Sequence, residues 1–305
     1  MDIKINKLSS YIKGFKKPLI IAGPCSAESN KQLLDTAYEL QKTKTSIFRA
    51  GIWKPRTRPN SFEGVGVKGL EWLNNVQKET GLKVITEVAN AKHVEQVLKS
   101  NIDMLWVGAR TTVNPFAVQE IAESLRGVDI PVFIKNPINP DMNLWLGAIE
   151  RFANIGCEKL VAIHRGFFSY GSKKYRNIPQ WQLPVELKRI LPNIPIICDP
   201  SHIAGSRDLI ESVSQKAIDL NFDGLMIESH IDPDNALSDK GQQISPNALD
   251  ILVAKLVIRH NTISDKDFEL SLEELRSQID SLDNDLIATL MNRMNIAELI
   301  GKHKK

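Results

Sequence analysis

The segment KVITEVANAKHVEQVLKSNIDMLWVGARTTVNPFAVQEIAESLRGVDIPVFIKN, residues 83–136, alternates short apolar runs with amphipathic stretches of helical period. Its three runs KVITEV, MLWVGA and PVFIKN are rich in β-branched and aromatic residues and have the length of buried strands. The stretches between them are long enough to form helices. Strands that alternate with helices in this way predict a parallel sheet of the α/β class.

The same alternation extends from Pro18 to His260. The strand pattern recurs in eight short runs, at residues 18–23, 46–51, 83–88, 104–109, 131–136, 159–164, 195–200 and 224–229. Eight strand-then-helix units in a segment of this length predict a (β/α)8 barrel at 18–260, preceded by an N-terminal extension at 1–17. A doubly wound open sheet is the alternative, and the regular repetition favours the barrel.

Composition places the chain among ordinary globular proteins, because 42% of its 305 residues are hydrophobic and 25% are charged. The formal net charge of +3 is too small to favour nucleic acid or an anionic membrane as the main partner. The apolar runs are too short for a membrane span or a secretory signal. Cys25, Cys157 and Cys198 form no CxxC pair, which suits a reducing compartment. We therefore predict a cytoplasmic protein with no nucleic-acid or membrane partner.

Reactive side chains follow every predicted strand. In chain order these residues are Cys25, Lys54 with Arg56, Glu87, Arg110, Lys135, His164 with Arg165, Asp199 with His202, and Glu228 with His230. A barrel enzyme assembles its active site from the C-terminal ends of its strands. The sequence therefore predicts an enzyme whose site lies at that end of the barrel.

A metal site is predicted from three of these residues and one residue of the loop after the eighth strand. Cys25, His202, Glu228 and Asp239 offer one thiolate, one imidazole and two carboxylates, which suits a transition metal of intermediate softness. The set contains too much oxygen for a closed structural zinc. The alternative is that Cys25 is a small buried apolar residue and His202 a hydrogen-bonded loop histidine.

Cationic residues form a second group near the same strand ends. Its members are Arg49, Lys54, Arg56, Arg58, Arg110, Lys135, Arg165 and Arg176. So many cations on a nearly neutral protein indicate small substrates with several negative charges. A solvated basic rim is the alternative. Arg49, Arg110 and Lys135 argue against it, because they lie in or directly after apolar strands, where an unpaired charge is costly.

Seven short motifs carry a family resemblance. They are GPCS at 23–26, KPRT at 54–57, GART at 108–111, IKNP at 134–137, IHRG at 163–166, DPSH at 199–202 and IES at 227–229. In this order they resemble the type I family of 3-deoxy-D-arabino-heptulosonate 7-phosphate (DAHP) synthases, over residues 18–260. The segment 136–141, NPINPD, departs from the Gly-containing loop of many relatives, and its two prolines predict a stiffer loop.

The resemblance implies a transferase of the shikimate pathway that condenses phosphoenolpyruvate with erythrose 4-phosphate and releases phosphate. It implies a divalent metal of the Mn, Fe, Co or Zn class. The implied roles are as follows: Cys25, His202, Glu228 and Asp239 hold the metal; Arg49, Arg110, Lys135 and Arg165 bind phosphoenolpyruvate; Arg56 and Thr57 bind the sugar phosphate; Lys54 is the candidate proton donor, and Glu87 or a metal-bound water takes the last proton.

Residues 264–305 have a different pattern, that of one long helix. Its apolar residues Leu272, Leu275, Ile279, Leu282, Leu286, Leu290 and Met294 recur every three or four positions. A lone helix cannot bury such a stripe, so we expect it to pack on the barrel, on another helix or on a second subunit of a homo-oligomer. From periodicity alone, a dimerising helix without chemistry is the favoured interpretation.

The segment ELRSQIDSLDNDLIATLMNRMNIAELIGKHK at 274–304 is also similar to the first helix of the all-helical chorismate mutase family. Arg276, Arg293 and Lys304 match that family's cationic substrate-binding positions, and the resemblance implies an intertwined dimer. A complete mutase needs two further helices. We therefore expect 261–305 to be a linker and an incomplete mutase-like domain, from a shortened chain or as a natural remnant.

Two other functions compete with DAHP synthesis. One is octulosonate 8-phosphate synthesis in the same superfamily, whose members typically have Lys-Ala-Asn-Arg where this chain has Lys54-Pro55-Arg56-Thr57. The other is a regulatory or scaffolding barrel that binds anions without turnover. The intact set of predicted metal ligands argues against the second.

Overall fold

The computed structural model describes residues 3–55, 60–172, 174–258 and 266–303. The chain divides into two compact units, Met1–Val257 and Ile258–Lys305. The first unit contains every strand of the described chain, and the second contains one long helix.

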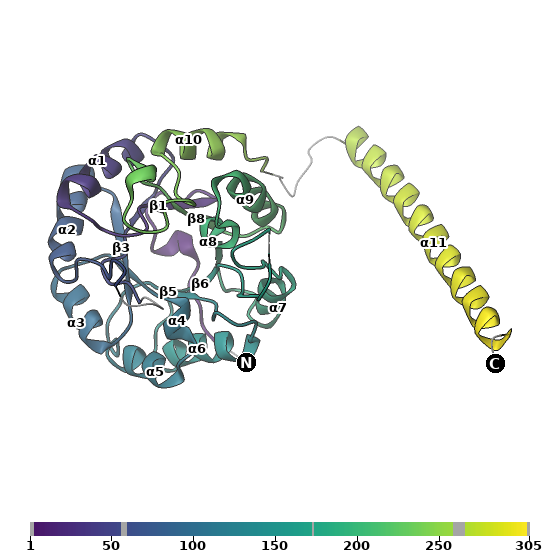
Figure 1. Ribbon diagram of the computed structural model, residues 1–305, viewed down its shortest axis with the longest axis horizontal. Coiled ribbons are helices and arrows are strands. Elements are labelled where there is room, and N and C mark those ends of the chain that lie inside the picture. Colours follow the sequence, from purple (N-terminus) through teal and green to yellow (C-terminus); the bar gives the residue numbers. More distant parts are fainter. Residues whose placement is uncertain (1–2, 56–59, 173, 259–265, 304–305) are drawn as a thin grey trace. The chain divides into compact units, whose positions relative to one another are not determined.

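The first unit is a closed barrel of parallel strands in the order β1-β2-β3-β4-β5-β6-β7-β8 (Figure 1). The strands are β1 Leu19–Gly23, β2 Ile47–Arg49, β3 Lys83–Val88, β4 Met104–Val107, β5 Val132–Lys135, β6 Leu160–His164, β7 Ile196–Cys198 and β8 Gly224–Glu228. Each lies within a run predicted from the sequence. Because β1 pairs with β8, the ring has no free edge, and the predicted (β/α)8 barrel is confirmed.

Helices surround the strands on the outside of the ring (Figure 1). The α-helices of this unit are α1 Asn30–Gln41, α2 Lys68–Thr80, α3 Ala91–Lys99, α4 Ala109–Thr112, α5 Pro115–Glu123, α6 Met142–Asn154, α7 Gln182–Ile190, α8 Pro200–Ala204, α9 Ile210–Asp219 and α10 Pro246–Lys255; the 3-10 turns are Leu8–Ser10, Arg207–Leu209 and Pro233–Asn235. Side chains of Ser29, Asn90, Asn114, Asp141 and Ser245 accept hydrogen bonds from backbone N–H groups of the following turn. These caps fix where each helix begins after its strand.

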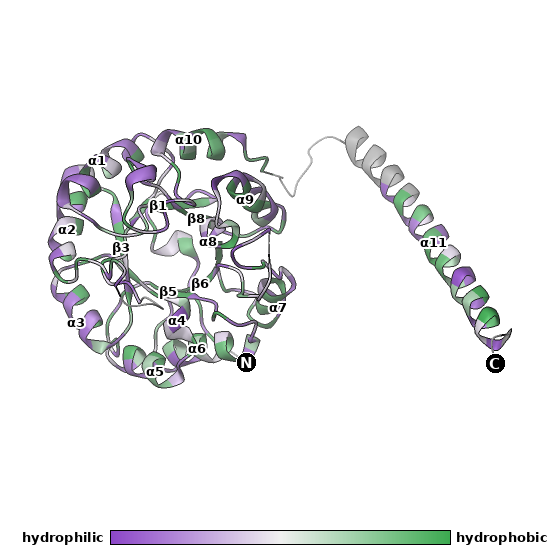
Figure 2. Cartoon of the chain, viewed as in Figure 1, coloured by the Kyte–Doolittle hydropathy of each residue, from purple (hydrophilic) through white to green (hydrophobic). Residues whose placement is uncertain are grey.

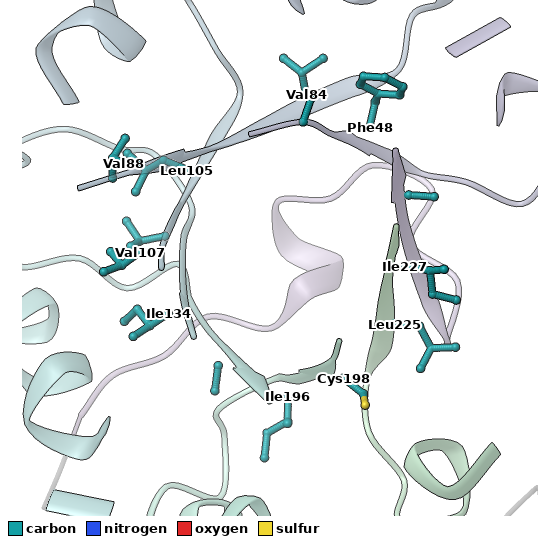
Figure 3. Close-up of a cluster of buried hydrophobic side chains, with 14 of the residues drawn as sticks. Phe48, Val84, Val88, Leu105, Val107, Ile134, Ile196, Cys198, Leu225 and Ile227 are labelled. Atoms are coloured by element: carbon teal, nitrogen blue, oxygen red, sulfur yellow. The ribbon is translucent and has the colours of Figure 1, made fainter. Parts of the chain in front are cut away.

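Alternation along the strands separates two apolar layers. Outward residues such as Phe48, Leu105 and Ile134 point away from the barrel axis (Figure 3) and pack against the helices. Inward residues such as Ile47, Trp106 and Phe133 fill the interior of the ring. Since successive side chains point to opposite faces, polar residues such as Arg49, Lys135 and Glu228 occupy the next inward positions at their strand ends, and they face the mouth of the barrel.

The N-terminal extension covers the opposite end of the barrel. Leu8 and Ile12 are buried in the interior layer. The backbone N–H of Asn6 donates to the carbonyl of Glu158, just before β6, and Lys17 Nζ donates to the carbonyl of Asn221, just before β8. The extension therefore seals the end at which the strands begin, which leaves the C-terminal end for a site.

The second unit contains α11, Lys266–His303, which confirms the predicted long helix. Figure 2 shows hydrophobic residues recurring along it. Among its described side chains, Ile279, Leu282, Leu286, Leu290 and Met294 are each more than half exposed. Within this unit the apolar stripe therefore remains in contact with solvent.

One histidine of the barrel wall is enclosed by aromatic rings. His164 points outward from β6, and its ring lies 5.2 Å from that of Trp181 and 5.8 Å from that of Phe167, centroid to centroid. Burial, with a smaller effect of Arg165, lowers the pKa of His164 to about 3. The imidazole is therefore neutral in the folded protein at physiological pH.

This burial predicts an acid-sensitive stability. Between pH 6.5 and 3 the unfolded chain binds a proton at His164 and the folded chain does not, so stability falls as the pH falls, by up to about 1.4 kcal/mol per pH unit. His164→Phe should reduce the slope of unfolding free energy against pH by that amount between pH 6 and 4, as measured by urea denaturation. Trp181→Phe is the control, because it changes the same aromatic enclosure without a titratable group. Equal slopes in the wild type and His164→Phe would contradict the prediction.

Candidate functional site

The structure brings the four predicted metal ligands together at the C-terminal mouth. Single ligand atoms of Cys25, Glu228 and Asp239 all lie within 4.8 Å of one another, and Cys25 Sγ is 3.2 Å from Asp239 Oδ2. His202 Nε2 lies 3.8 Å from Glu228 Oε1. These residues come from the end of β1, the start of α8, the end of β8 and the loop after β8.

The chemistry of this cluster fits a divalent cation. Glu228 is fully buried, and its Oε1 accepts no hydrogen bond from the described residues. Burial, reinforced by Glu228, raises the pKa of the Cys25 thiol to about 12, although Lys54 partly offsets this. A bound cation would satisfy the carboxylate oxygen and favour the thiolate. Sulfur, nitrogen and oxygen donors together suit a transition metal.

Asp199 supports the cluster; the sequence placed it among the reactive residues at the strand ends but assigned it no role. Its carboxylate lies 2.9 Å from His202 Nδ1 and accepts a hydrogen bond of 2.7 Å from Lys135 Nζ. Burial alone would raise the pKa of Asp199, but His202 and Lys135 hold it well below its ordinary value. The ionised carboxylate orients the His202 ring so that Nε2 faces Glu228. Its position beside His202 in the DPSH motif was the available signal.

Two buried glutamines hold the loop that carries Asp239. Gln243 Oε1 accepts from the backbone N–H of Cys25 at 2.9 Å, and Gln243 Nε2 donates to the carbonyl of Ser238 at 2.7 Å. Gln242 Nε2 donates to Glu228 Oε2 at 2.7 Å. The loop is thereby tied to both β1 and β8. No motif pointed to these glutamines, and the contact that ties Gln243 to β1 joins residues 218 positions apart.

Arg176 forms an ion pair with Asp239, with Nη1 2.9 Å from Oδ1. Burial would raise the pKa of Asp239, but Arg176 and His202 lower it well below its ordinary value. Arg176 belonged to the predicted cationic group. In the structure it contacts a predicted metal ligand, which indicates a role in placing the Asp239 carboxylate.

A group of buried cations lies beside this cluster. Arg49 is 1% exposed and Lys135 is 5% exposed. Arg165 is also buried, and burial lowers its pKa to about 10 while its Nη1 donates to Asn177 Oδ1 at 2.7 Å. Lys54 Nζ donates to the carbonyl of Cys25 at 2.6 Å, and Arg49 Nη2 donates to the same carbonyl at 3.3 Å. Cys25 therefore joins the cationic group to the metal-ligand group.

Arg110 was expected to be a buried charge at the end of an apolar strand, and the structure shows otherwise. It lies in the short helix α4, and its side chain is exposed. The chain turns out of the barrel wall at Gly108, so the guanidinium reaches solvent at the mouth. Arg56, Thr57 and Arg58, the predicted contacts with the sugar phosphate and their neighbour, lie outside the described residues.

Glu87 faces the same mouth from the end of β3. Its Oε2 accepts a hydrogen bond of 3.1 Å from Trp106 Nε1. Its Oε1 lies against Gly108, where an added Cβ would come within 2.1 Å of that oxygen. A larger residue at this position would therefore have to displace the Glu87 carboxylate from its present place.

The segment that follows β5 is linked to β6 through Asn136. Asn136 Oδ1 accepts from the backbone N–H of Arg165 at 2.7 Å, and its Nδ2 donates to the carbonyl of Gly166 at 2.8 Å. These two hydrogen bonds fix the position of Arg165 relative to Lys135.

The predicted mutase-like positions lie on α11. Arg276 and Arg293 are exposed, and Lys304 lies outside the described residues.

The family model described as the DAHP synthetase I family matches residues 2–261. The chain belongs to this family. It is 34% identical over 225 residues to a phospho-2-dehydro-3-deoxyheptonate aldolase of Thermotoga maritima, an alignment that covers 74% of this chain and 64% of the relative. It is 29% identical over 269 residues to a 2-dehydro-3-deoxyphosphooctonate aldolase of Cupriavidus taiwanensis, covering 80% and 88%.

Solved structures of the Thermotoga maritima DAHP synthase resemble the fold. One matches with a TM-score of 0.69 and 31% identity, over 79% of this chain and 68% of that one. A truncated form matches with a TM-score of 0.68 and 30% identity, over 78% and 84%. This chain thus spans just under two thirds of the length of its curated Thermotoga relative. Within the described residues, no helix has the length and apolarity needed to span a membrane.

The contacts of Asp199 predict its effect on metal binding. Asp199→Asn should lower the affinity for a divalent metal about 10- to 100-fold, because the amide can no longer hold the His202 ring and neutralise Lys135 together. Competition with a chromophoric chelator measures this affinity. Asp141→Asn is the matched control, since Asp141 is also an N-cap aspartate but caps α6. The two variants binding metal equally well would contradict the assigned role of Asp199.

Proposed function

We propose that the barrel is a DAHP synthase, a transferase that condenses phosphoenolpyruvate with erythrose 4-phosphate and so begins the shikimate pathway and aromatic amino acid biosynthesis. The observation that carries this proposal is the junction at Cys25. Its thiol belongs to the metal-ligand cluster, while its carbonyl accepts hydrogen bonds from Lys54 and Arg49. A carbonyl-activating group and an anion-binding group therefore lie on either side of one residue.

A divalent metal held by Cys25, His202, Glu228 and Asp239 would supply Lewis acidity toward the aldehyde oxygen. The protein's own cations do the remaining electrostatic work. Arg49, Lys135 and Arg165 would bind the phosphate and carboxylate of phosphoenolpyruvate, with Arg110 reaching in from α4. The planar guanidinium group of arginine can donate two parallel hydrogen bonds to a phosphate or to a carboxylate. Arg56 and Thr57 are proposed to hold the sugar phosphate.

Proton transfers follow from the charges of two side chains. Burial lowers the pKa of Lys54, but Cys25 and Glu87 outweigh it and raise the pKa above its ordinary value, so the ammonium is available as an acid. As C3 of phosphoenolpyruvate bonds to the aldehyde carbon, Lys54 would protonate the aldehyde oxygen. Water then adds to C2 and loses a proton, for which Glu87 is the candidate acceptor. The C2 hydroxyl then gives up its proton to the departing phosphate as its C–O bond becomes a carbonyl, the C–O bond to phosphate breaks, and DAHP and inorganic phosphate are released.

Octulosonate 8-phosphate synthesis is the second candidate function. It is favoured by the similarity to octulosonate aldolases, which extends over about 80% of this chain. Lys54-Pro55-Arg56-Thr57 supports the heptulosonate instead, as does the higher identity to the Thermotoga enzyme. A barrel that binds anions without turnover is less well supported, because the buried Glu228 oxygen and the Cys25 thiol remain in place for a metal.

For the domain organisation we propose three parts: an N-terminal extension at 1–17, a synthase barrel at 18–260, and at 261–305 a linker and mutase-like helix that assembles a homo-oligomer. The exposed apolar residues of α11 support assembly. Arg276 and Arg293, with Lys304, are the proposed mutase-like positions. A cytoplasmic location is also proposed, since the three cysteines are free and buried.

A substrate assay tests the synthase proposal. Metal-loaded protein should consume phosphoenolpyruvate when erythrose 4-phosphate is added, measured as loss of ultraviolet absorbance. Treatment with a chelator should abolish consumption, and added Mn²⁺ should restore it. Cys25→Ala should lower the rate at least 100-fold, whereas Cys157→Ala, which removes a buried cysteine at the opposite end of the barrel, should keep most of the rate.

The same assay separates the competing functions. Consumption with arabinose 5-phosphate in place of erythrose 4-phosphate would assign the octulosonate reaction. Lack of consumption with either sugar, by protein shown to contain metal, would contradict both synthase functions and favour an anion-binding barrel.

Removal of residues 264–305 tests the role of α11. The shortened protein should assemble from fewer subunits, as calculated from its mass by light scattering, because the exposed stripe of α11 is lost. In the full chain, the double variant Leu282→Glu with Leu286→Glu should have the same effect, because it places charges in the apolar stripe. Asp283→Ser on the same helix is the matched control and should leave the number of subunits unchanged. If the deletion and the double variant both keep the wild-type number of subunits, the assembly role is contradicted.

A further inference from the structure

Trp106 lies directly beneath the buried cations of the site. It is an inward residue of β4 and is fully buried. The Arg49 Cζ atom lies 5.0 Å from the centroid of its ring, and Lys135 Nζ lies 5.7 Å from it. One aromatic ring thus contacts cations from two other strands, β2 and β5.

Arg49 in particular has few other partners in the described part of the chain. Arg49 Nε and Nη1 are buried and make no hydrogen bond among the described residues, and its Nη2 has only contacts of 3.3–3.4 Å with Cys25 and Glu228. Lys135 is better satisfied, through Asp199. An indole ring presents a negative face, and this attraction is strongest where water is excluded. The ring therefore stabilises Arg49 while leaving its donors available.

The ring itself is held at its edge. Trp106 Nε1 donates to Glu87 Oε2 at 3.1 Å, and Glu87 is confined by its contact with Gly108. A hydrogen bond in the plane of the indole fixes the direction in which the ring faces. Residues of β2, β3 and β5 are thus coupled through one side chain of β4.

We propose that Trp106 is a positioning residue for phosphoenolpyruvate binding: its ring face orients Arg49 and Lys135 toward the phosphate and carboxylate of the substrate. This inference rests on the proposed synthase function. It predicts an effect mainly on phosphoenolpyruvate, because both cations that the ring contacts, Arg49 and Lys135, are proposed to bind that substrate.

Ring-removing and ring-retaining variants test the proposal in the metal-loaded full-length protein. Trp106→Leu should raise the Kd for phosphoenolpyruvate, measured by calorimetry, and its KM at least 10-fold, while the KM for erythrose 4-phosphate changes less than 3-fold. Trp106→Phe keeps a ring face and should stay within about 5-fold of the wild type in both constants. Phe133→Leu is the matched control, since Phe133 is the strand neighbour of Trp106 and a buried ring of the same interior layer. It should change neither constant more than 3-fold.

Several results would overturn the inference. These are an unchanged Kd in Trp106→Leu, an equal rise in Phe133→Leu, or a rise in Trp106→Phe as large as in Trp106→Leu. Thermal unfolding monitors folding, and Trp106→Met provides a second ringless variant that must show the same rise. Failure of the wild type to bind or consume phosphoenolpyruvate would instead overturn the proposed function, and the inference with it.

Discussion

Closure of eight parallel strands into one ring is the constraint on which the site depends. The hydrogen bonds between β1 and β8 bring residues from the two ends of the barrel domain to one mouth, so that Cys25 and Glu228 become neighbours. Because side chains alternate along each strand, the same closure directs Arg49, Glu87 and Lys135 toward the axis above the apolar interior. An open sheet would leave these residues spread along an edge.

The mouth contains several buried charges, and the structure pairs them with specific partners. Lys135 is paired with Asp199, and Arg49 with Glu228 and the face of Trp106, while the more exposed Arg176 pairs with the half-buried Asp239. A buried charge without a partner would be strongly destabilising. The remaining deficit, at the Glu228 oxygen and at the donors of Arg49, lies where the proposed metal and the substrate anion would bind.

The C-terminal unit differs from the barrel in how its apolar side chains are buried. The barrel buries its apolar residues within a single chain, whereas the described apolar side chains of α11 are largely exposed. A long helix with such a stripe gains most of its stability from a partner surface. This contrast is why the function of the barrel is argued from its own contacts, while that of α11 is argued from the surface that it leaves to be covered.

The sequence by itself determined the barrel and predicted most of the residues that the structure brings together at its mouth, because strand and helix periods are local properties and because reactive residues follow each strand. It also indicated the four-residue metal cluster, since strand ends converge in any barrel. Only the tertiary structure decided which contacts orient these residues. Asp199 and Lys135 are 64 positions apart; Gln243 lies far from Cys25 in the chain; and Trp106 reads as one more apolar strand residue. Whether Arg110 is exposed was also decided by the turn of the chain at Gly108. Such contacts depend on which strands become neighbours and on side-chain direction at the mouth, and neither is recorded in a local pattern.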